Sequence, residues 1–350
     1  MLPLLPLDPA AYVVARADEI RLGQAIHYLA DTAAAHPDNF AAALQQAYSA
    51  GQRVAIVGVP ESIGPRANLG RGGAETAWPA FLSAFLNLQD NWHMPSHDIL
   101  MLGQIDCADL QAEADSLDPQ HPSELAQLRA LCSKLDQRVA QILGPVFSAG
   151  FEVILVGGGH NNAYPLLRSL ADTAAQPCAA VNLDPHADFR LREGRHSGNG
   201  FSYAYVEGAL ADYHIVGLHE GKNTAASLKQ LADANFRYHS TSHLRDMYFT
   251  EAMQDVAARA AAWQRPLGIE VDIDAIQGVP ASAINYAGCQ VVQADYYVRT
   301  LAELPTTRYL HLAEAAPSLH PSGVAEGNRQ VGQVLTELTL AYLTGRTRRP

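Results

Sequence analysis

Histidine and aspartate residues recur at short spacing in three places along the chain. One group follows the pattern Asp-x-His-x-Asp, another follows Asp-x-Asp, and a single histidine comes directly after three glycines. Residues two apart in an extended chain share a face, so each group could direct its side chains to one point. Carboxylate oxygens and imidazole nitrogens are typical ligands of divalent metal ions. The six candidate ligands are His160, Asp184, His186, Asp188, Asp272 and Asp274.

Four carboxylates and two imidazoles are too many ligands for one ion that must also leave room for a substrate. Two divalent ions about 3.5–4 Å apart, sharing bridging carboxylates, fit the set better. Oxygen-rich ligation with some imidazole favours Mn²⁺, although nickel, iron and cobalt stay open because raw affinity does not select manganese. Each group alone has an ordinary explanation as a turn or a cap. Together they predict a binuclear hydrolase, because burying four carboxylates without cations would be very costly.

The elements that must position these groups are predicted strands and helices in alternation. Apolar runs such as VAIVG and VILVG are typical of strands buried on both faces of a parallel sheet. The predicted strands span residues 53–58, 98–103, 152–157, 179–184, 213–218, 236–239, 268–274 and 308–314. The predicted helices span residues 41–50, 74–88, 123–149, 163–173, 224–234, 251–263 and 324–343. This order predicts an α/β fold whose ligand site lies beyond the carboxyl ends of the strands.

No internal repeat, low-complexity tract or convincing linker divides the chain. We therefore expect one domain over residues 1–350, with residues 1–50 forming a helical extension packed on the sheet. In the long predicted helix, Ser123 is a plausible N-cap and Gly150 a plausible C′ residue. Pro145, after Gly144, is expected to kink this helix or split it in two.

Composition and charge exclude several classes of partner. The formal charge of -12 argues against nucleic acid, which needs a basic face. The four cysteines are widely spaced and form no CxxC pair, so free thiols in a reducing cytoplasm are expected instead of a cysteine zinc site. No stretch approaches 18 consecutive apolar residues, and the short proline-containing N-terminus lacks the basic region of a signal peptide. The glycine runs GRGGA and VGGGH lack the spacing of nucleotide-binding loops.

The ordered motifs resemble those of the ureohydrolases, the family of arginase, agmatinase and formimidoylglutamase. Family motifs of the form GG(D/G)H, DAHxD and DxD are similar to GGH at residues 158–160, DPHAD at 184–188 and DID at 272–274. GVP at residues 58–60 and RANLGRGGA at 66–74 also resemble the family, and the match spans roughly residues 53–345. The resemblance implies the three-layer α/β/α arginase–deacetylase fold with an eight-stranded, mostly parallel sheet. It also implies two Mn²⁺ ions per subunit and a homo-oligomer, commonly a trimer or hexamer.

Within the family, the details resemble the formimidoylglutamase branch. Phe201 stands near the position where arginases have a proton-shuttling histidine, and GGGH replaces GGDH. Residues 68–71 and 311–317 favour the same branch. The substrate implied is N-formimino-L-glutamate. Four residues near the motifs depart from the family pattern and leave the exact substrate open: Asn161, Asn162, Pro185 and Gln277.

The resemblance also implies roles for residues around the metal ions. Asp188 could hold the attacking water and relay its proton, and Glu314 could pair with the planar, cationic head of the substrate or merely cap its strand. His196 and His219 could transfer protons in place of the missing histidine, or could simply be packed or solvent-facing. A substrate carboxylate needs cations or neutral donors nearby. The candidates are Asn68, Arg71, Arg190, Arg192 and Asn199.

Three other functions stay open at this point. A guanidino-hydrolase acting on arginine, agmatine or a shorter guanidino acid would release urea, whereas a formimino substrate would release formamide. A deacetylase-like amide hydrolase would use a single Zn²⁺ and does not call for the full ligand set. A non-catalytic family member would bind metal and turn over nothing. Each class separates from the others by product and by metal stoichiometry.

Overall fold

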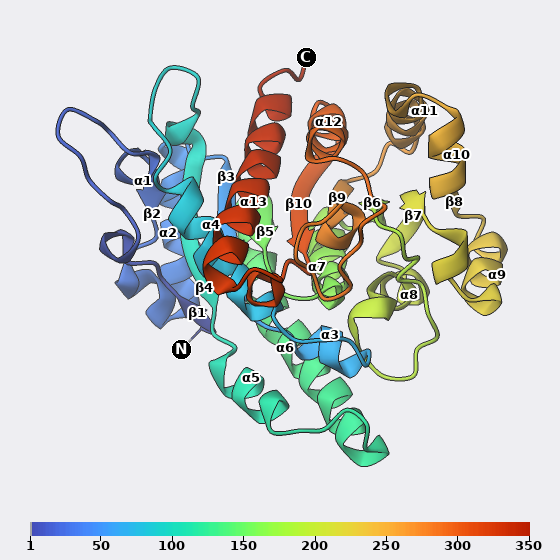
Figure 1. Cartoon of the computed structure of the whole chain (residues 1–350). Coiled ribbons are helices and arrows are strands. Elements are labelled where there is room, and N and C mark those ends of the chain that lie inside the picture. Colours follow the sequence, from blue (N-terminus) through green and yellow to red (C-terminus); the bar gives the residue numbers. More distant parts are fainter. Residues whose placement is uncertain (1) are drawn as a thin grey trace.

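A sheet of ten strands runs through the centre of the computed structural model, which describes residues 2–350 (Figure 1). Among these residues, the strand order is β1-β4-β3-β5-β10-β9-β6-β7-β8, and β2 also pairs with β4. Among the pairings of these strands, all are parallel except that of β1 with β4, which confirms the mostly parallel sheet. The strands are β1 Leu4–Leu5, β2 His27–Tyr28, β3 Val54–Gly58, β4 Ile99–Ile105, β5 Glu152–Val156, β6 Cys178–Leu183, β7 Leu210–Leu218, β8 Arg237–Ser240, β9 Leu267–Asp272 and β10 Thr307–Ala313.

The two strands beyond the predicted eight come from the first fifty residues. β1 and β2 both pair with β4, on the side of that strand that β3 leaves free. The segment was expected to be helical, but it mixes these strands with short helices and one long helix, α2. Pairing with β4 satisfies backbone groups that an edge strand would otherwise expose. The N-terminal segment therefore completes the sheet as well as packing on it.

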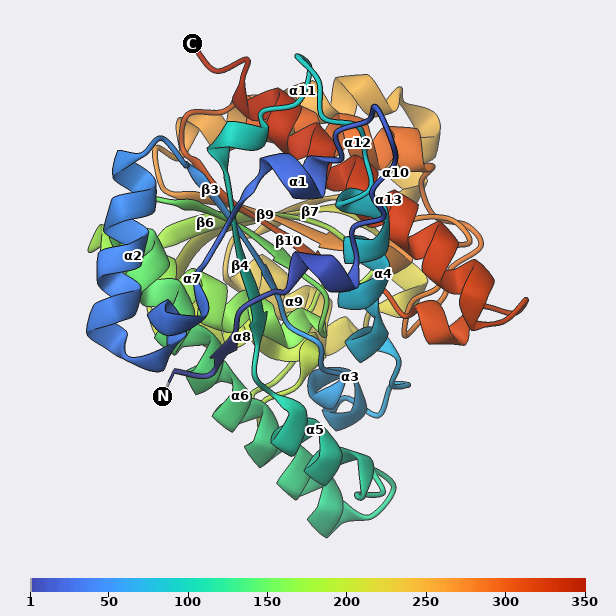
Figure 2. The same cartoon turned by 90° about the vertical axis from the view of Figure 1, so that its left-hand side faces the viewer.

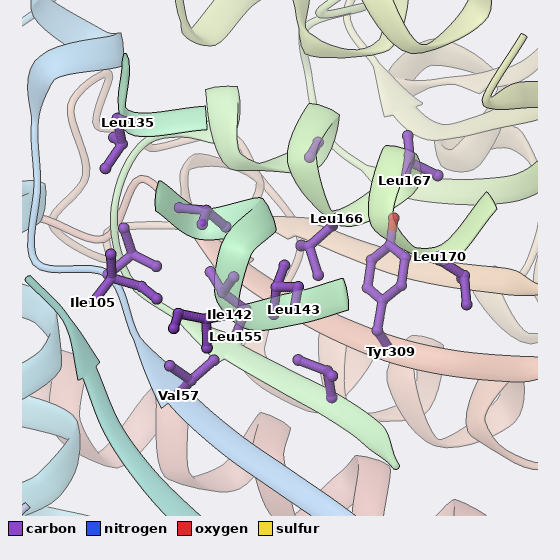
Figure 3. Packing of buried hydrophobic residues seen from close by; sticks show 14 of the residues in the cluster. Val57, Ile105, Leu135, Ile142, Leu143, Leu155, Leu166, Leu167, Leu170 and Tyr309 are labelled. Atoms are coloured by element: carbon purple, nitrogen blue, oxygen red, sulfur yellow. The ribbon is translucent and has the colours of Figure 1, made fainter. Parts of the chain in front are cut away.

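Helices cover both faces of the sheet, as the three-layer prediction requires. Along β5, Val153 and Leu155 pack with residues of α6 and α7, whereas Ile154 and Val156 pack with residues of α4 and α13. Figure 2 shows these two helix layers on opposite sides of the strands. Figure 3 shows α7 leucines lying over the sheet beside Tyr309. Burial on both faces explains why the strands read as continuous apolar runs.

The helices agree with most of the predicted ranges and add several that the sequence pattern did not reveal. The additions are α1, α3, α5, α8, α10 and α12. All but α12 are too short to show a helical period over several turns, whereas α12 buries apolar side chains at helical spacing and was overlooked. The helices are α1 Leu22–Ala25, α2 Pro37–Ser49, α3 Ile63–Ala67, α4 Ala77–Phe85, α5 Ala108–Asp115, α6 Pro122–Ser148, α7 Ala163–Ala174, α8 Gly200–Val206, α9 Ala225–Asp233, α10 Thr241–Asp246, α11 Phe249–Ala262, α12 Val291–Ala302 and α13 Val324–Arg346.

Helix α6 is not split at Pro145. It begins at Pro122, after His121 as N-cap in place of the predicted Ser123, and continues past the proline to Ser148. Because Pro145 lies in the last turn, its missing N–H and its ring disturb only the end of the helix. Gly150 has φ +98°, the left-handed conformation that its predicted place after the helix requires.

Four neighbouring strands at the middle of the sheet carry the residues of interest. In the order β5-β10-β9-β6, their carboxyl ends lead to His160, Glu314, Asp272 and Asp184. Parallel strands end at the same edge, so these side chains meet although they are far apart in sequence. Among residues 2–350, none of the helices combines the length and the apolar character needed to cross a membrane.

Candidate metal centre

The two aspartate motifs turn sharply where their strands end. The carboxylate of Asp184 accepts a hydrogen bond from the amide of His186 at 2.6 Å, and that of Asp272 accepts one from the amide of Asp274 at 2.8 Å. Asp188 has φ +45°. The expectation that these residues converge because the chain is extended is therefore wrong. They converge because each leading aspartate folds the chain back over its own side chain.

All six predicted ligands come together in two overlapping groups of buried and half-buried side chains. Within each group, the candidate ligand atoms lie within 4.8 Å of one another. We call His160, Asp184, Asp188 and Asp272 the first ligand set, and Asp184, His186, Asp272 and Asp274 the second ligand set. Asp184 and Asp272 belong to both sets, which is the arrangement that two bridged ions need.

Histidine nitrogens face carboxylates within each set. His160 Nδ1 lies 3.0 Å from Asp188 Oδ2 and 3.4 Å from Asp184 Oδ2. In the second set, His186 Nδ1 lies 3.2 Å from Asp274 Oδ2 and 3.4 Å from Asp184 Oδ1. Each ligand set therefore contains one imidazole beside its carboxylates, which would hold one ion each.

The donor set fits a pair of divalent cations. Both ring nitrogens of His160 and Oδ1 of Asp274 are buried without a hydrogen-bond partner in residues 2–350, a state that folded proteins rarely leave uncompensated. Burial, together with the charge of Asp184, raises the pKa of Asp188 to about 6. Burial and the charge of Asp272 raise the pKa of Asp274 well above its usual value. Clustered carboxylates of this kind require compensating positive charge.

Glu61 holds the glycine-rich loop that carries His160, and sequence reasoning missed it. Its buried carboxylate accepts hydrogen bonds from the amide of Gly159 at 2.7 Å and from the side chains of Asn162 at 2.8 Å and Asn161 at 3.2 Å. It also accepts from the amides of residues 63 and 64. The two asparagines that depart from the family pattern therefore pair with a carboxylate from the loop after β3.

Glu314 lies at the end of β10 with φ +67°. One carboxylate oxygen accepts a hydrogen bond from the backbone amide of His160 at 2.9 Å, and the other accepts one from the hydroxyl of Ser282. Burial, aided by the charge of Asp272, raises the pKa of Glu314 to about 8. The side chain thus ties β10 to the His160 loop while it lines the cleft over the metal centre.

A cleft of about 350 Å³ opens over both ligand sets. Asp188, Asp274 and Glu314 are part of its lining, and Arg190 and Lys222 supply positive charge there. Asn68 also lines the cleft, where its side-chain oxygen accepts a hydrogen bond from Arg190 Nη1 at 2.6 Å. Lys222 was not predicted, although its place just after β7 at the carboxyl edge of the sheet was a usable signal. The cleft thus combines one buried carboxylate beside the metal centre with two cations.

The remaining predicted residues lie outside the lining of this cleft. His196 is buried, its Nδ1 accepts from the amide of Gly198, and burial lowers its pKa to about 3. The Asn199 side chain accepts from Arg195 Nη1 at 2.7 Å and donates to backbone carbonyls of its own loop. His219 lines a separate pocket. Arg71 Nε donates to the backbone oxygen of Ser282 at 3.4 Å, and Arg192 lines a neighbouring surface pocket.

Comparison with known proteins identifies the family. A sequence model of the arginase family matches residues 52–339. The chain belongs to the arginase family. The predicted family, the three-layer fold and the class of hydrolase acting on C–N bonds of linear amidines are thereby confirmed.

Several relatives of this arginase-family member are formimidoylglutamases. The enzyme of Aromatoleum aromaticum is 23% identical over 284 residues, which cover 77% of this chain and 78% of that protein. That of Chromobacterium violaceum is 27% identical over 270 residues, 69% and 79% of the two chains. Among solved structures, formimidoylglutamase from Bacillus subtilis superposes with a TM-score of 0.74 at 17% identity and covers 98% of this chain and 97% of its own. Trypanosoma cruzi formiminoglutamase with two Mn²⁺ ions has a TM-score of 0.69 at 18% identity, with 95% and 100% covered.

Proposed function

We propose that this protein hydrolyses N-formimino-L-glutamate to L-glutamate and formamide at a centre of two Mn²⁺ ions. The observation that carries the proposal is the pairing of two ligand sets, which share Asp184 and Asp272, with a cleft that adds two cations and one buried carboxylate outside both sets, Glu314. The relatives named formimidoylglutamase, and the related structure with Mn²⁺, support the same assignment.

The charges of the cleft match those of this substrate. N-formimino-L-glutamate carries two carboxylates and a cationic formimino group. Arg190 and Lys222 would bind the carboxylates through charge-assisted hydrogen bonds. Glu314, ionised once bound cations offset the charges of Asp272 and Asp188, would accept N–H bonds from the formimino head through the two lone pairs that remain after its bonds to His160 and Ser282. Agmatine has no carboxylate for the two cations to bind, so the cleft favours the formimino acid over it.

The two ligand sets would hold one Mn²⁺ each, with Asp184 and Asp272 between them. When bound, the ion pair supplies an activated water near neutral pH and stabilises negative charge on the reacting centre. Asp188, at the edge of the first ligand set and in the cleft lining, would orient the attacking water and pass its proton to the leaving nitrogen. Formamide and the free amine of glutamate then result from addition of one water across the C–N bond.

Several predicted residues take other roles in this proposal. His196 and Asn199 would shape the loop that presents Arg190, since their polar atoms bond to that loop and to Arg195. His219 and Arg192 line other pockets, so a direct role for them stays a prediction without contacts in the cleft. Arg71 would support Ser282 and, through it, Glu314.

The test is product analysis with Mn²⁺-loaded protein. We expect glutamate and formamide from N-formimino-L-glutamate, and no urea from arginine, agmatine or guanidinobutyrate measured in parallel. Urea from a guanidino compound would keep the binuclear centre but move the protein to the guanidino-hydrolases. Two bound ions with no turnover of any substrate would indicate a non-catalytic member. Absence of bound metal would refute the central claim.

We further propose that the chain acts as a single ureohydrolase-like domain, assembled into a trimer or hexamer in the cytoplasm. All four cysteines are free, which suits a reducing compartment. The exposed side chains of Tyr248, Tyr286 and Val292 are 77%, 67% and 67% accessible, and each is next in sequence to a residue that lines the pocket containing His219. Such apolar exposure suits a subunit interface. Light scattering after size-exclusion chromatography measures the oligomeric state, and a monomer at all concentrations would contradict this proposal.

A further inference from the structure

A buried carboxylate outside the predicted ligand set lies on the second side of the His160 ring. Glu270 belongs to β9, is fully buried, and places its Oε2 3.3 Å from His160 Nε2. The other ring nitrogen, Nδ1, faces Asp188 in the first ligand set at 3.0 Å. Nδ1 of the imidazole therefore faces the proposed metal centre, and Nε2 faces Glu270.

Two residues of β10 hold Glu270 from the neighbouring strand. The Tyr309 hydroxyl donates to Glu270 Oε1 at 2.6 Å, and His311 Nδ1 lies 2.6 Å from Oε2. The register of the parallel pair sets His311 directly beside Glu270 and Tyr309 beside Gly268. A Cβ on Gly268 would lie 2.1 Å from the Tyr309 ring. Because Gly268 has no side chain, the Tyr309 ring can lie over it and its hydroxyl can reach Glu270.

The surroundings give Glu270 little freedom to move. Glu270, Tyr309 and His311 are each 0% exposed, and Figure 3 shows the Tyr309 ring beside Leu166, Leu167 and Leu170 of α7. A carboxylate that receives a hydroxyl proton on one oxygen and faces imidazole nitrogens with the other acts as an acceptor. Glu270 is consequently a fixed negative charge behind the ring of a metal ligand.

A histidine can bind a metal ion only through a nitrogen that carries no proton, so its other nitrogen must carry one. For His160 the metal-facing nitrogen is Nδ1, and the proton belongs on Nε2. In residues 2–350, His160 Nε2 has no hydrogen-bond partner, and Glu270 Oε2 faces it. A carboxylate that accepts this proton fixes the tautomer and the ring orientation, and it makes the imidazole a stronger ligand.

We propose that Glu270 is a positioning residue that orients His160 for the first ligand set, and that Tyr309 and His311 hold Glu270 in place. This role rests on the proposed two-ion centre. It makes the two ion sites differ in their dependence on Glu270. The second ligand set contains no His160. Loss of Glu270 should therefore weaken Mn²⁺ binding at the first ion site and leave binding at the second unchanged.

The experiment titrates metal-free protein with Mn²⁺ by calorimetry and follows the ions by electron paramagnetic resonance, which distinguishes a coupled Mn²⁺ pair from an isolated ion. In Glu270→Gln we expect one binding step to weaken roughly 10- to 100-fold, the range found for partners of metal-bound histidines. The other step should match that of wild type, since its ligand set lacks His160. At limiting Mn²⁺ the spectrum of the isolated ion replaces that of the pair. Tyr309→Phe keeps the packed ring, removes only the hydroxyl, and weakens the same step by a smaller factor.

Glu152→Gln is the matched control. Glu152 is also a buried strand carboxylate bonded to a tyrosine hydroxyl, that of Tyr342 at 2.7 Å, but it lies at the start of β5 and away from the ligand sets. Its two Mn²⁺ steps should equal those of wild type. Unchanged binding in folded Glu270→Gln overturns the inference, and if that variant does not fold, unchanged binding in Tyr309→Phe overturns it. Three equivalent Mn²⁺ ions in wild type would also overturn it, because His160, Glu270 and His311 would then hold an ion themselves. Failure of wild type to bind two ions refutes the proposed centre instead.

Discussion

At the scale of single residues, the six proposed ligands are not equivalent. Asp184 and Asp272 belong to both ligand sets, whereas Asp188 belongs only to the first and Asp274 only to the second. A bridging carboxylate supports both ions and keeps their charges close together. Its loss should therefore cost more metal than the loss of a ligand at one end.

Replacing Asp272 by alanine should remove both ions, and replacing Asp188 by asparagine should remove the first ion and leave the second. Activity should fall more than about 100-fold in both, since even partners of metal ligands contribute roughly 10- to 100-fold. Metal analysis after gel filtration measures the stoichiometry. Asp255→Asn is the control, because Asp255 lies on α11 with its side chain half exposed. Retention of two ions by Asp272→Ala would show that it does not bridge.

The cations of the cleft should act on substrate binding and leave the metal in place. Lys222 lines the cleft but belongs to neither ligand set. In Lys222→Ala we expect kcat/KM for N-formimino-L-glutamate to fall roughly tenfold or more, mainly through KM, because a charge-assisted hydrogen bond is lost. Steady-state kinetics with a parallel Mn²⁺ assay makes the measurement. An unchanged KM would exclude Lys222 from binding a substrate carboxylate.

At the scale of elements, the pair β9 and β10 builds the interior behind the metal centre. β9 presents Gly268, Glu270 and Asp272 in alternation, so that these three positions share one face. β10 presents Tyr309 and His311 beside them in register. The strand pair thus carries Asp272, a proposed metal ligand, at its end, and Glu270, which contacts His160, two residues earlier.

Gly268→Ala tests this packing. The added Cβ would lie 2.1 Å from the Tyr309 ring, and such overpacking costs about 1–3 kcal/mol or more. Urea unfolding should show a lower midpoint. Gly144→Ala is the matched control, because a Cβ there meets no atom within 4 Å and alanine favours the helix by roughly 0.5–1 kcal/mol. Equal midpoints for Gly268→Ala and wild type would mean that the ring moves aside freely.

At the scale of the whole molecule, acid should destabilise the fold through histidines buried in the neutral form. Burial, with the charge of His239 beside it, lowers the pKa of His214 from 6.5 to about 3. Its Nε2 bonds to His239 Nδ1 at 2.9 Å, and Arg259 and Asp255 are the charged groups around it. Below pH 6.5 the unfolded chain takes up this proton and the folded chain does not. The stabilisation is therefore complete above that pH and is lost as the pH falls towards 3.

His214→Gln removes this titration while it keeps a polar group near His239. We expect the urea midpoint of metal-free protein to fall less steeply between pH 6.5 and about 3 in the variant than in wild type. Both proteins keep the carboxylates of the metal centre, so the difference in slope reports His214. Identical slopes would show that this histidine does not contribute to acid sensitivity.

The sequence by itself determined the proposed metal chemistry and the approximate positions of most strands and helices. The ligand residues stand in short motifs directly after apolar runs, so local spacing was enough to find His160, Asp184 and Asp272 with their neighbours. Strands buried on both faces were likewise recognisable from their continuous apolar composition. The short helices and the two N-terminal strands carry no such periodic signal and were missed.

Only the tertiary structure decided which of these residues contact one another. Asp184 and Asp272 can belong to both ligand sets because β6 and β9 are adjacent, and the contact between Glu270 and His160 depends on where the loop after β5 lies relative to β9. Glu61 reaches the His160 loop from 98 residues away. Asn199 was a candidate donor to a substrate carboxylate, and only the structure shows that its side-chain nitrogen donates to the backbone oxygens of Leu191 and Gly194. Such contacts depend on strand order and register, which are set by packing of the whole chain, whereas a motif depends only on neighbours in sequence.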